Sequence, residues 1–279
     1  MKTQKFVDLY YHNTMRLHCI ADEVVYPESL SELKEIVTSG HDYAVIGGCS
    51  NIVFPPKLHK RIVSLEEMYT NIEFRDGLVI CGSSIKIAKL IRECQKRNLG
   101  GIEYLISVPC SVGGAIFQNA GRGKNYHQTI SNYIEWVECL NCKSGLVEMI
   151  TKEQCQFDHR ESLFKKDRSR IILRACFKFI TQKQEISERY IKERLNYSKM
   201  KLDFERPSCG SVFSSGNGRI FNILKGLRIG GAKFSSKTAN WISNIGGAKQ
   251  WQIILLVYIA IILHIITFRK YKVEIEIWR

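Results

Sequence analysis

The sequence has few of the features that mark specialised chains. It contains no low-complexity tract, no internal repeat and only five prolines, and its composition is ordinary for a globular protein. Because Met1–Lys5 leads into no apolar segment, we expect no signal peptide, a cytoplasmic location and reduced thiols. The G-x-G-x-x-G, Walker, H-E-x-x-H and G-x-S-x-G motifs are also absent, so no site built on them is indicated.

Acidic residues are scarce relative to basic ones. The chain has 41 Lys+Arg against 27 Asp+Glu, a net charge of +14, and such a chain attracts anions. The basic residues are scattered, without zinc-finger spacing or an aromatic-basic pattern, so nucleotide ligands are favoured over DNA or RNA and no nucleic-acid partner is expected. The 279 residues, 45% of them hydrophobic, suffice for one large domain or two.

Two local features have ordinary explanations. Cys139-x-x-Cys142 has no second ligand pair at zinc spacing, so we interpret it as a strand end followed by a turn and expect no metal. The apolar run Ile253–Ile266 contains His264 and is shorter than the roughly 20 residues of a membrane span, which favours a core helix. We therefore expect no membrane partner, although a basic protein anchored by residues 253–266 is kept as an alternative.

Hydrophobic periodicity predicts short helices and strands without a regular βαβ rhythm. A helix is expected over 27–39, with Ser29 as cap and Glu32 completing a capping box. Further helices are expected over 85–98, 185–197 and 253–266, and strands over 43–46, 52–54, 71–74, 78–81, 133–140, 146–150, 171–179 and 272–278. This mixture predicts the α+β class.

Two glycine-rich turns carry the first functional signal. Gly47–Asn51 follows one strand, and Ser111–Gly114 lies in a second small-residue segment. Glycine lets backbone N–H groups approach an anion, and successive N–H groups form a nest for phosphate oxygens. Two tight turns would be the plainer interpretation. From the residues alone, nucleotide binding is the furthest conclusion.

Six segments in order resemble the UDP-N-acetylmuramate dehydrogenases, also called UDP-N-acetylenolpyruvoylglucosamine reductases. They are VIGGCSNIVF (45–54), VPCSVGGAIFQNAG (108–121), CQFDHRESLFK (155–165), PSCGSVF (207–213), GLRIGGAKFSSKTANWISN (226–244) and VEIEI (273–277). No insertion matches the tyrosine loop of longer members, so the chain is most similar to the shorter subtype. The matches span nearly the whole chain.

The resemblance implies a domain organisation and two cofactors. Residues 1–183 would form an FAD-binding domain of the vanillyl-alcohol-oxidase (PCMH) type, and residues 184–279 a smaller α+β substrate-binding domain. NADPH would reduce the flavin, and the substrate would be a UDP-sugar bound by a monomer. The residues implied at the FAD pyrophosphate are Gly47, Gly48, Ser50 and Asn51, and those implied at the flavin are Ser111, Val112, Gly113, Gly114, Asn119, Ala120 and Gly121.

The implied reaction reduces the enolpyruvyl group of UDP-N-acetylglucosamine enolpyruvate to UDP-N-acetylmuramate, a precursor of peptidoglycan. Hydride addition places negative charge on the substrate carboxylate as an enolate, which a fixed arginine stabilises, and Arg160 fills that motif position. Ser211 matches the hydroxyl that delivers the proton, and Glu276 the carboxylic group that assists. Taken singly, these would be an ion-pair arginine, a turn serine and a solvent-facing strand residue.

The chain departs from the family pattern at several positions. Cys49 and Cys110 replace glycines, His159 replaces a tyrosine, Thr238 replaces a histidine, and Ser214-Ser215-Gly216 follows the serine motif. A positive φ at either cysteine would cost about 1–2 kcal/mol. A divergent paralogue that binds flavin or another nucleotide sugar, with altered or lost activity, is therefore the second hypothesis.

Overall fold

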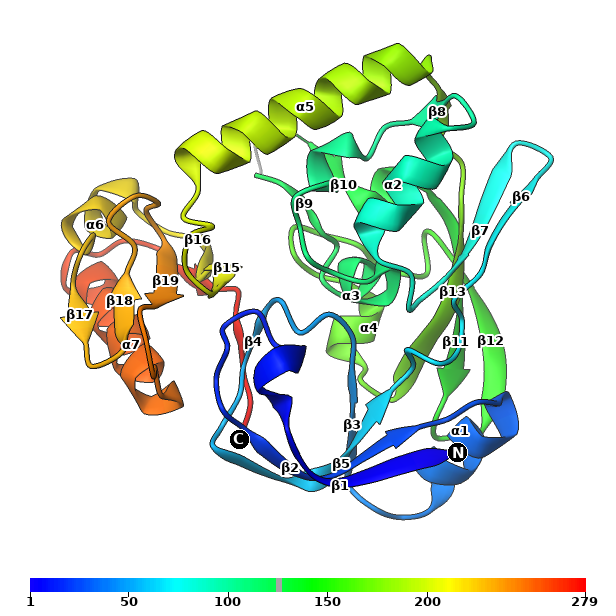
Figure 1. Cartoon of the computed structure of the whole chain (residues 1–279), viewed down its shortest axis with the longest axis horizontal. Coiled ribbons are helices and arrows are strands. Elements are labelled where there is room, and N and C mark those ends of the chain that lie inside the picture. The colour runs from blue at the N-terminus through cyan, green and yellow to red at the C-terminus, as the bar shows by residue number, and fades with distance from the viewer. Residues whose placement is uncertain (124–126) are drawn as a thin grey trace. The chain divides into compact units, whose positions relative to one another are not determined.

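The computed structural model describes residues 1–123 and 127–279 and divides the chain into two compact units (Figure 1). Unit 1 contains Met1–Gln4, Glu23–Gly48 and Lys60–Leu195. Unit 2 contains Lys5–Asp22, Cys49–His59 and Asn196–Arg279. The units are therefore discontinuous in sequence, and the chain passes between them inside strands β1 (Lys2–Asp8), β2 (Ile20–Tyr26) and β5 (Lys57–Ser64) and helix α5 (Gln184–Lys201).

Unit 1 is built on a five-stranded antiparallel sheet in the order β12-β11-β13-β7-β6. Its strands are β6 (Ile72–Arg75), β7 (Leu78–Gly82), β11 (Ile134–Asn141), β12 (Leu146–Thr151) and β13 (Arg170–Phe177). Five of the strands predicted from sequence are these, with ends within two residues. Two-stranded pairs join β8 (Leu99–Gly100) to β14 (Ile180–Thr181) and β9 (Gly121–Arg122) to β10 (Gln128–Thr129).

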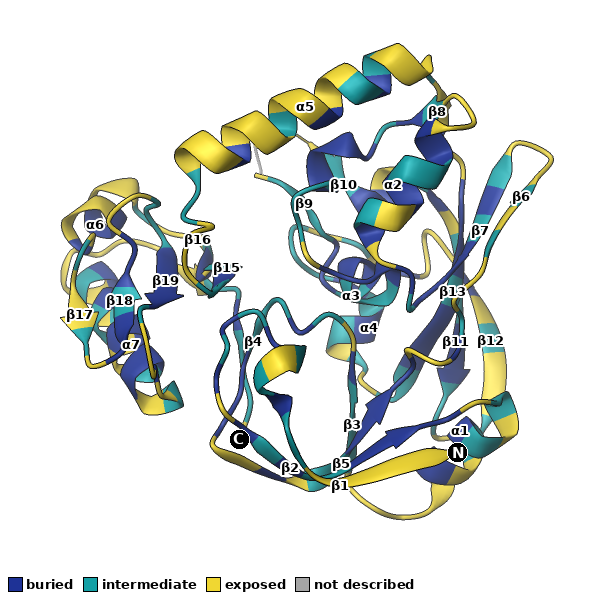
Figure 2. Cartoon of the chain, viewed as in Figure 1, coloured by how far each residue is buried: buried dark blue, intermediate teal, exposed yellow. Residues whose placement is uncertain are grey.

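Both faces of this sheet are covered by apolar side chains. On one face Ile172 and Ala175 of β13 join the core of α2 (Ile87–Gln95) and α3 (Val112–Phe117). On the other, Ile171 and Leu173 join the residues of α1 (Leu30–Thr38) and β5. Strand β13 is therefore buried along most of its length, as Figure 2 shows. A short helix α4 (Leu163–Lys166) precedes it, and β3 (Tyr43–Ile46) pairs in parallel with β5.

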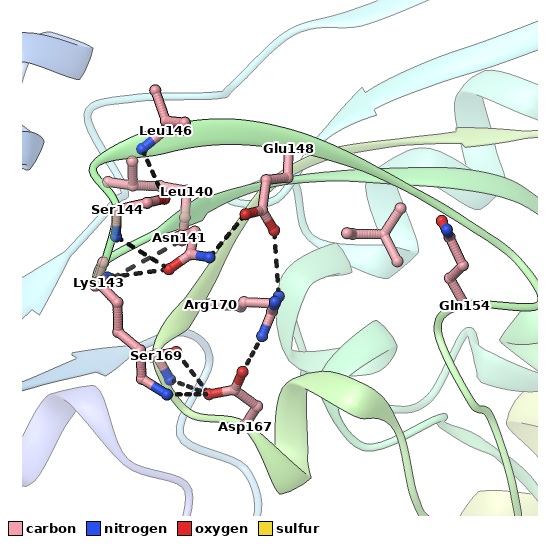
Figure 3. Close-up of polar contacts among 12 residues, drawn as sticks. Leu140, Asn141, Lys143, Ser144, Leu146, Glu148, Gln154, Asp167, Ser169 and Arg170 are labelled. Atoms are coloured by element: carbon pink, nitrogen blue, oxygen red, sulfur yellow. Dashed lines mark hydrogen bonds and ion pairs between the residues drawn. The ribbon is translucent and has the colours of Figure 1, made fainter.

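Local side-chain bonds set the ends of several elements. The Ser29 hydroxyl accepts the N–H of Glu32 at 3.2 Å and so caps α1, as predicted, and the Glu32 carboxylate accepts the N–H of Glu28 at 2.8 Å. At the turn after β11, the side-chain oxygen Oδ1 of Asn141 accepts the N–H of Lys143 at 3.0 Å (Figure 3). The Cys139–Cys142 pair thus marks a strand end and turn, as expected.

Unit 2 contains a four-stranded sheet in the order β15-β19-β18-β17. Its strands are β15 (Ser208–Ser211), β17 (Arg228–Ile229), β18 (Ala232–Phe234) and β19 (Trp241–Asn244). Two small pairs join β16 (Phe213–Ser215) to β20 (Lys272–Val273) and β4 (Ile52–Val53) to β21 (Glu276–Ile277). Helices α6 (Gly218–Ile223) and α7 (Gln250–Ile266) pack on the same core. The predicted final strand, 272–278, is thus two short strands that pair with different partners.

Candidate functional site

The two glycine-rich turns meet within unit 1. A Cβ added to Gly47 would stand 2.7 Å from the Ser111 hydroxyl oxygen, and one added to Gly48 would stand 2.8 Å from the Pro109 carbonyl oxygen. Real side-chain carbons do not approach so closely, so both positions require glycine. The structure therefore brings together Gly47, Gly48 and Ser111 from the predicted cofactor set.

The amide groups of the second turn serve the protein itself. Val112 donates its N–H to the Ile85 carbonyl and Gly113 donates to the Ser83 carbonyl, each at 2.8 Å. Gly114 donates to the Ser111 hydroxyl at 3.2 Å, which caps α3. The N–H groups of residues 112–114 thus have acceptors within the protein, because α3 docks its first turn on the loop after β7. Gly113 and Gly114 offer a ligand a backbone without side chains.

The first turn differs in this respect. In residues 1–123 and 127–279 the N–H groups of Gly48 and Ser50 have no protein acceptor, and Cys49 between them has a φ of 45°. A left-handed residue between exposed N–H groups is a feature of anion-binding nests. Half of the predicted pyrophosphate turn belongs to unit 1, with Gly47 and Gly48, and half to unit 2, with Ser50 and Asn51.

Three buried polar atoms of unit 1 have no partner among the described residues. They are the Ser83 hydroxyl, the Tyr104 hydroxyl and the Gln118 amide nitrogen, and the three residues are 5%, 8% and 9% exposed. Burial raises the pKa of Tyr104, so its hydroxyl keeps its proton and can donate. Because an unpaired buried polar group costs about 1–3 kcal/mol, such groups indicate a polar ligand. FAD, with its polar ring edges, fits these residues.

Asn119, Gly121 and Arg160 form one bonded group. Arg160 donates from Nη1 to the Asn119 carbonyl at 3.2 Å and from Nη2 to the Gly121 carbonyl at 2.7 Å. The Asn119 amide donates to the Asp158 carbonyl at 2.8 Å. Arg160 has a φ of 59° and Asn119 a φ of 42°, and strained backbone of this kind concentrates at functional sites. Ala120 lies between Asn119 and Gly121 in the chain, and its N–H donates to the Ala115 carbonyl at 2.8 Å.

The other predicted catalytic residues belong to unit 2. Glu276 pairs with Ile52 in the β21–β4 ladder, and its N–H donates to the Asn51 carbonyl at 2.8 Å. The Asn51 side chain in turn donates to the Glu274 carbonyl at 3.0 Å. Ser211 ends β15 with an exposed side chain, and no described residue bonds its hydroxyl. Val212, next to it, accepts the N–H of Glu274 at 2.8 Å, so the segment that follows Ser211 is bonded to the segment that precedes Glu276.

The comparisons with known proteins cover nearly the whole chain. A family model described as "FAD binding domain" matches residues 21–150. The UDP-N-acetylenolpyruvoylglucosamine reductase of Thermotoga sp. (strain RQ2) is 31% identical over 252 residues, 87% of this chain and 82% of that protein. The enzyme of that name from Pseudothermotoga lettingae is 28% identical over 281 residues, 97% of this chain and 95% of its own. The crystal structure of the Thermus caldophilus UDP-N-acetylenolpyruvylglucosamine reductase aligns with a TM-score of 0.83, at 25% identity and full coverage of both chains.

The chain belongs to the UDP-N-acetylenolpyruvoylglucosamine reductase family. The predicted α+β class with an FAD-binding domain is thereby confirmed. The chain keeps both glycine-rich turns of this reductase family but has a cysteine in each. The two cysteines differ in backbone conformation. Cys49 has the positive φ that favours glycine, whereas Cys110 does not, and both are buried.

Sequence reasoning missed Ser83, Tyr104 and Gln118 as candidate ligand contacts of this reductase. No motif marks these residues in the sequence, and only the fold shows that their polar atoms are buried. The other departures from the family pattern are built into local structure. Thr238, for example, accepts the N–H of Asp203 at 2.9 Å and donates to the Lys201 carbonyl at 3.1 Å.

The described residues hold no further candidate centre. No group of three or more metal-binding side chains occurs among them, and the ten cysteines are all free. None of the described helices is both long enough and apolar enough to cross a membrane.

Proposed function

We propose that the protein is an FAD-dependent reductase that converts UDP-N-acetylglucosamine enolpyruvate to UDP-N-acetylmuramate with NADPH. The observation that carries the proposal is the packing of Gly47 and Gly48 against the turn that begins α3, in a chain of the reductase family. The relatives' names supply the reaction, and the site residues supply its physical parts.

When bound, FAD supplies the hydride chemistry, and the protein supplies position and charge. The N–H groups of Gly48 and Ser50 would bind the cofactor's phosphates, and the segment Ser111–Gly114 would lie along the flavin. Asn119, Ala120 and Gly121 would complete that side. We further propose that residues 1–183 form the cofactor-binding domain and residues 184–279 the substrate-binding domain.

Arg160 suits the stabilisation of an enolate. Its guanidinium donates to the backbone carbonyls of Asn119 and Gly121, which orients the planar group. A preoriented cation lowers the energy of charge that develops in the transition state. We propose that Arg160 stabilises the enolate, that the Ser211 hydroxyl holds the proton that the substrate carbon receives, and that Glu276 assists that transfer.

The test is Ser211→Ala. If Ser211 is the general acid, the variant keeps its flavin spectrum and its bleaching by NADPH, whereas substrate reduction falls about 10²–10⁴-fold. Ser208→Ala, on the same strand, is the matched control and should keep normal turnover. Unchanged turnover in Ser211→Ala would remove Ser211 from the mechanism.

The alternative is a divergent paralogue that binds flavin or another nucleotide sugar with altered or lost activity. The observation that favours it is Cys49 at a left-handed position of the phosphate turn. A yellow protein whose NADPH oxidation does not respond to UDP-N-acetylglucosamine enolpyruvate would support this alternative. A colourless protein that does not take up FAD would contradict the reductase and the flavin-binding form of the alternative. Action as a monomer in the cytoplasm stays a prediction.

A further inference from the structure

Helix α7 is apolar on the side that faces solvent as well as on the side that faces the core. Its exposed side chains follow one another at intervals of four and three residues, which is one stripe of a helix. The stripe consists of Trp251 (56% exposed), Leu255 (43%), Tyr258 (52%), Ile262 (54%) and Ile265 (56%). Ile266 and Phe268 extend it at the end of the helix and are also exposed.

This outer stripe is not part of the core. The opposite side of α7 already fills unit 2 with Ile253, Leu256, Val257 and Ala260, and each of these is at most 3% exposed. His264, on the inner side, is fully paired, since it contacts the Ala260 carbonyl at 2.7 Å and the Asn217 N–H at 2.9 Å. A surface helix normally presents polar residues to water, so an apolar outer stripe indicates a partner.

The charges around α7 decide what kind of partner fits. No Asp or Glu occurs from Ile245 to Val273. Lys249 precedes the helix, and Arg269, Lys270 and Lys272 follow it. All four residues are exposed. A second copy of the chain would bring Lys249, Arg269 and Lys270 against their own kind, and each copy carries a net charge of +14. An anionic surface has the complementary charge.

We propose that the outer stripe of α7 docks on an anionic phospholipid surface. Aromatic residues with one polar end, such as Trp251 and Tyr258, are favoured at the level of lipid headgroups. The helix has 17 residues, about 25 Å at 1.5 Å per residue, and one side of it is buried in the protein core. It therefore lies along the lipid surface with its stripe among the headgroups, while the basic residues at its ends contact lipid phosphates.

The test is flotation of the full-length protein with vesicles. Wild type should float with vesicles of phosphatidylglycerol and phosphatidylcholine at about 0.1 M salt, and much less with phosphatidylcholine alone, because surface charge contributes about fivefold in binding per basic residue. The double variant Ile262→Gln/Ile265→Gln should bind the vesicles with an affinity at least about tenfold lower than that of wild type. The matched control is Leu146→Gln/Met149→Gln, which removes equally exposed apolar side chains from β12 and should bind as wild type does.

Two further variants separate charge and position from folding. Arg269→Gln/Lys270→Gln should lose most binding to the anionic vesicles, whereas Lys183→Gln/Lys192→Gln, an equal change of charge elsewhere, should retain it. Trp251→Phe should still bind but should lose the vesicle-induced blue shift of tryptophan emission.

Failure of wild type to float would overturn the proposal. So would a concentration-dependent dimer that Ile262→Gln/Ile265→Gln abolishes, because the stripe would then belong to a second copy. Neither outcome depends on the reductase activity.

Discussion

Cys49 is a side chain at a position whose backbone favours glycine. Its φ is 45°, and a β-carbon in the left-handed region costs about 1–2 kcal/mol. We therefore expect Cys49→Gly to be more stable than Cys49→Ala by about 1 kcal/mol, because glycine removes that clash. The measurement is the free energy of unfolding from urea titrations of both variants.

Cys110 provides the matched control for Cys49. It is similarly buried, at 7% against 5% exposure, but its φ is not positive. Here glycine only adds freedom to the unfolded chain, so Cys110→Gly should be less stable than Cys110→Ala by about 0.5–1 kcal/mol. The same order at both positions would show that Cys49 carries no backbone strain.

At the scale of single residues, sequence predicted where the chain bends but not how its polar groups are used. Small residues identify the turns at Gly47 and Ser111, because few other residues fit there. Whether an N–H group is available is decided by a distant acceptor, as Ile85 and Ser83 show for Val112 and Gly113. No local pattern carries that information.

Elements with a strong period were predicted well, and polar strands were missed. Helix α7 begins at Gln250 rather than at the expected Ile253, since Lys249 is not a usual capping residue. Strand β5 was missed because its first half, Lys57–Arg61, is almost wholly basic. It is supported by pairing with acidic residues of β2, including His59 with Asp22 at 3.0 Å.

The start of α7 depends on one buried side chain. The Gln252 side-chain oxygen accepts the N–H of Lys249 at 3.0 Å and that of Gly231 at 3.1 Å. Gln252→Ala leaves both donors without this acceptor, and we expect it to lower the free energy of unfolding by about 2–3 kcal/mol. Leu255→Ala, on the exposed side of the same helix, should cost less than about 1 kcal/mol. Equal losses in urea unfolding would assign the effect to helix propensity instead.

At the scale of the whole molecule, the two compact units interleave along the chain. Residues 5–22 and 49–59 belong to unit 2, although unit 1 supplies the segments on either side of them. Composition and periodicity act over about ten residues and contain no signal for such an exchange. The sequence motifs nevertheless occur in the family's order, so resemblance supplied the fold where local patterns could not.

The buried thiols couple the stability of the whole fold to alkaline pH. Burial raises the pKa of six of them from the ordinary 9 to about 12, namely Cys19, Cys94, Cys110, Cys139, Cys155 and Cys209. Because the raised pKa belongs to the folded state, the neutral thiols stabilise fully below pH 9, and this contribution is lost as pH rises from 9 toward 12.

Each of these thiols should lower the free energy of unfolding by up to about 1.4 kcal/mol per pH unit in that range. We expect urea midpoints that are nearly level between pH 7 and 8.5 and that fall steeply above pH 9. Cys94→Ala removes one titrating group, so its stability should decline less steeply with pH than that of wild type, whatever its stability at pH 7.5. If the free energy of unfolding of the two proteins declined equally with pH, Cys94 would have the same pKa in the folded and unfolded states, and burial would not raise it.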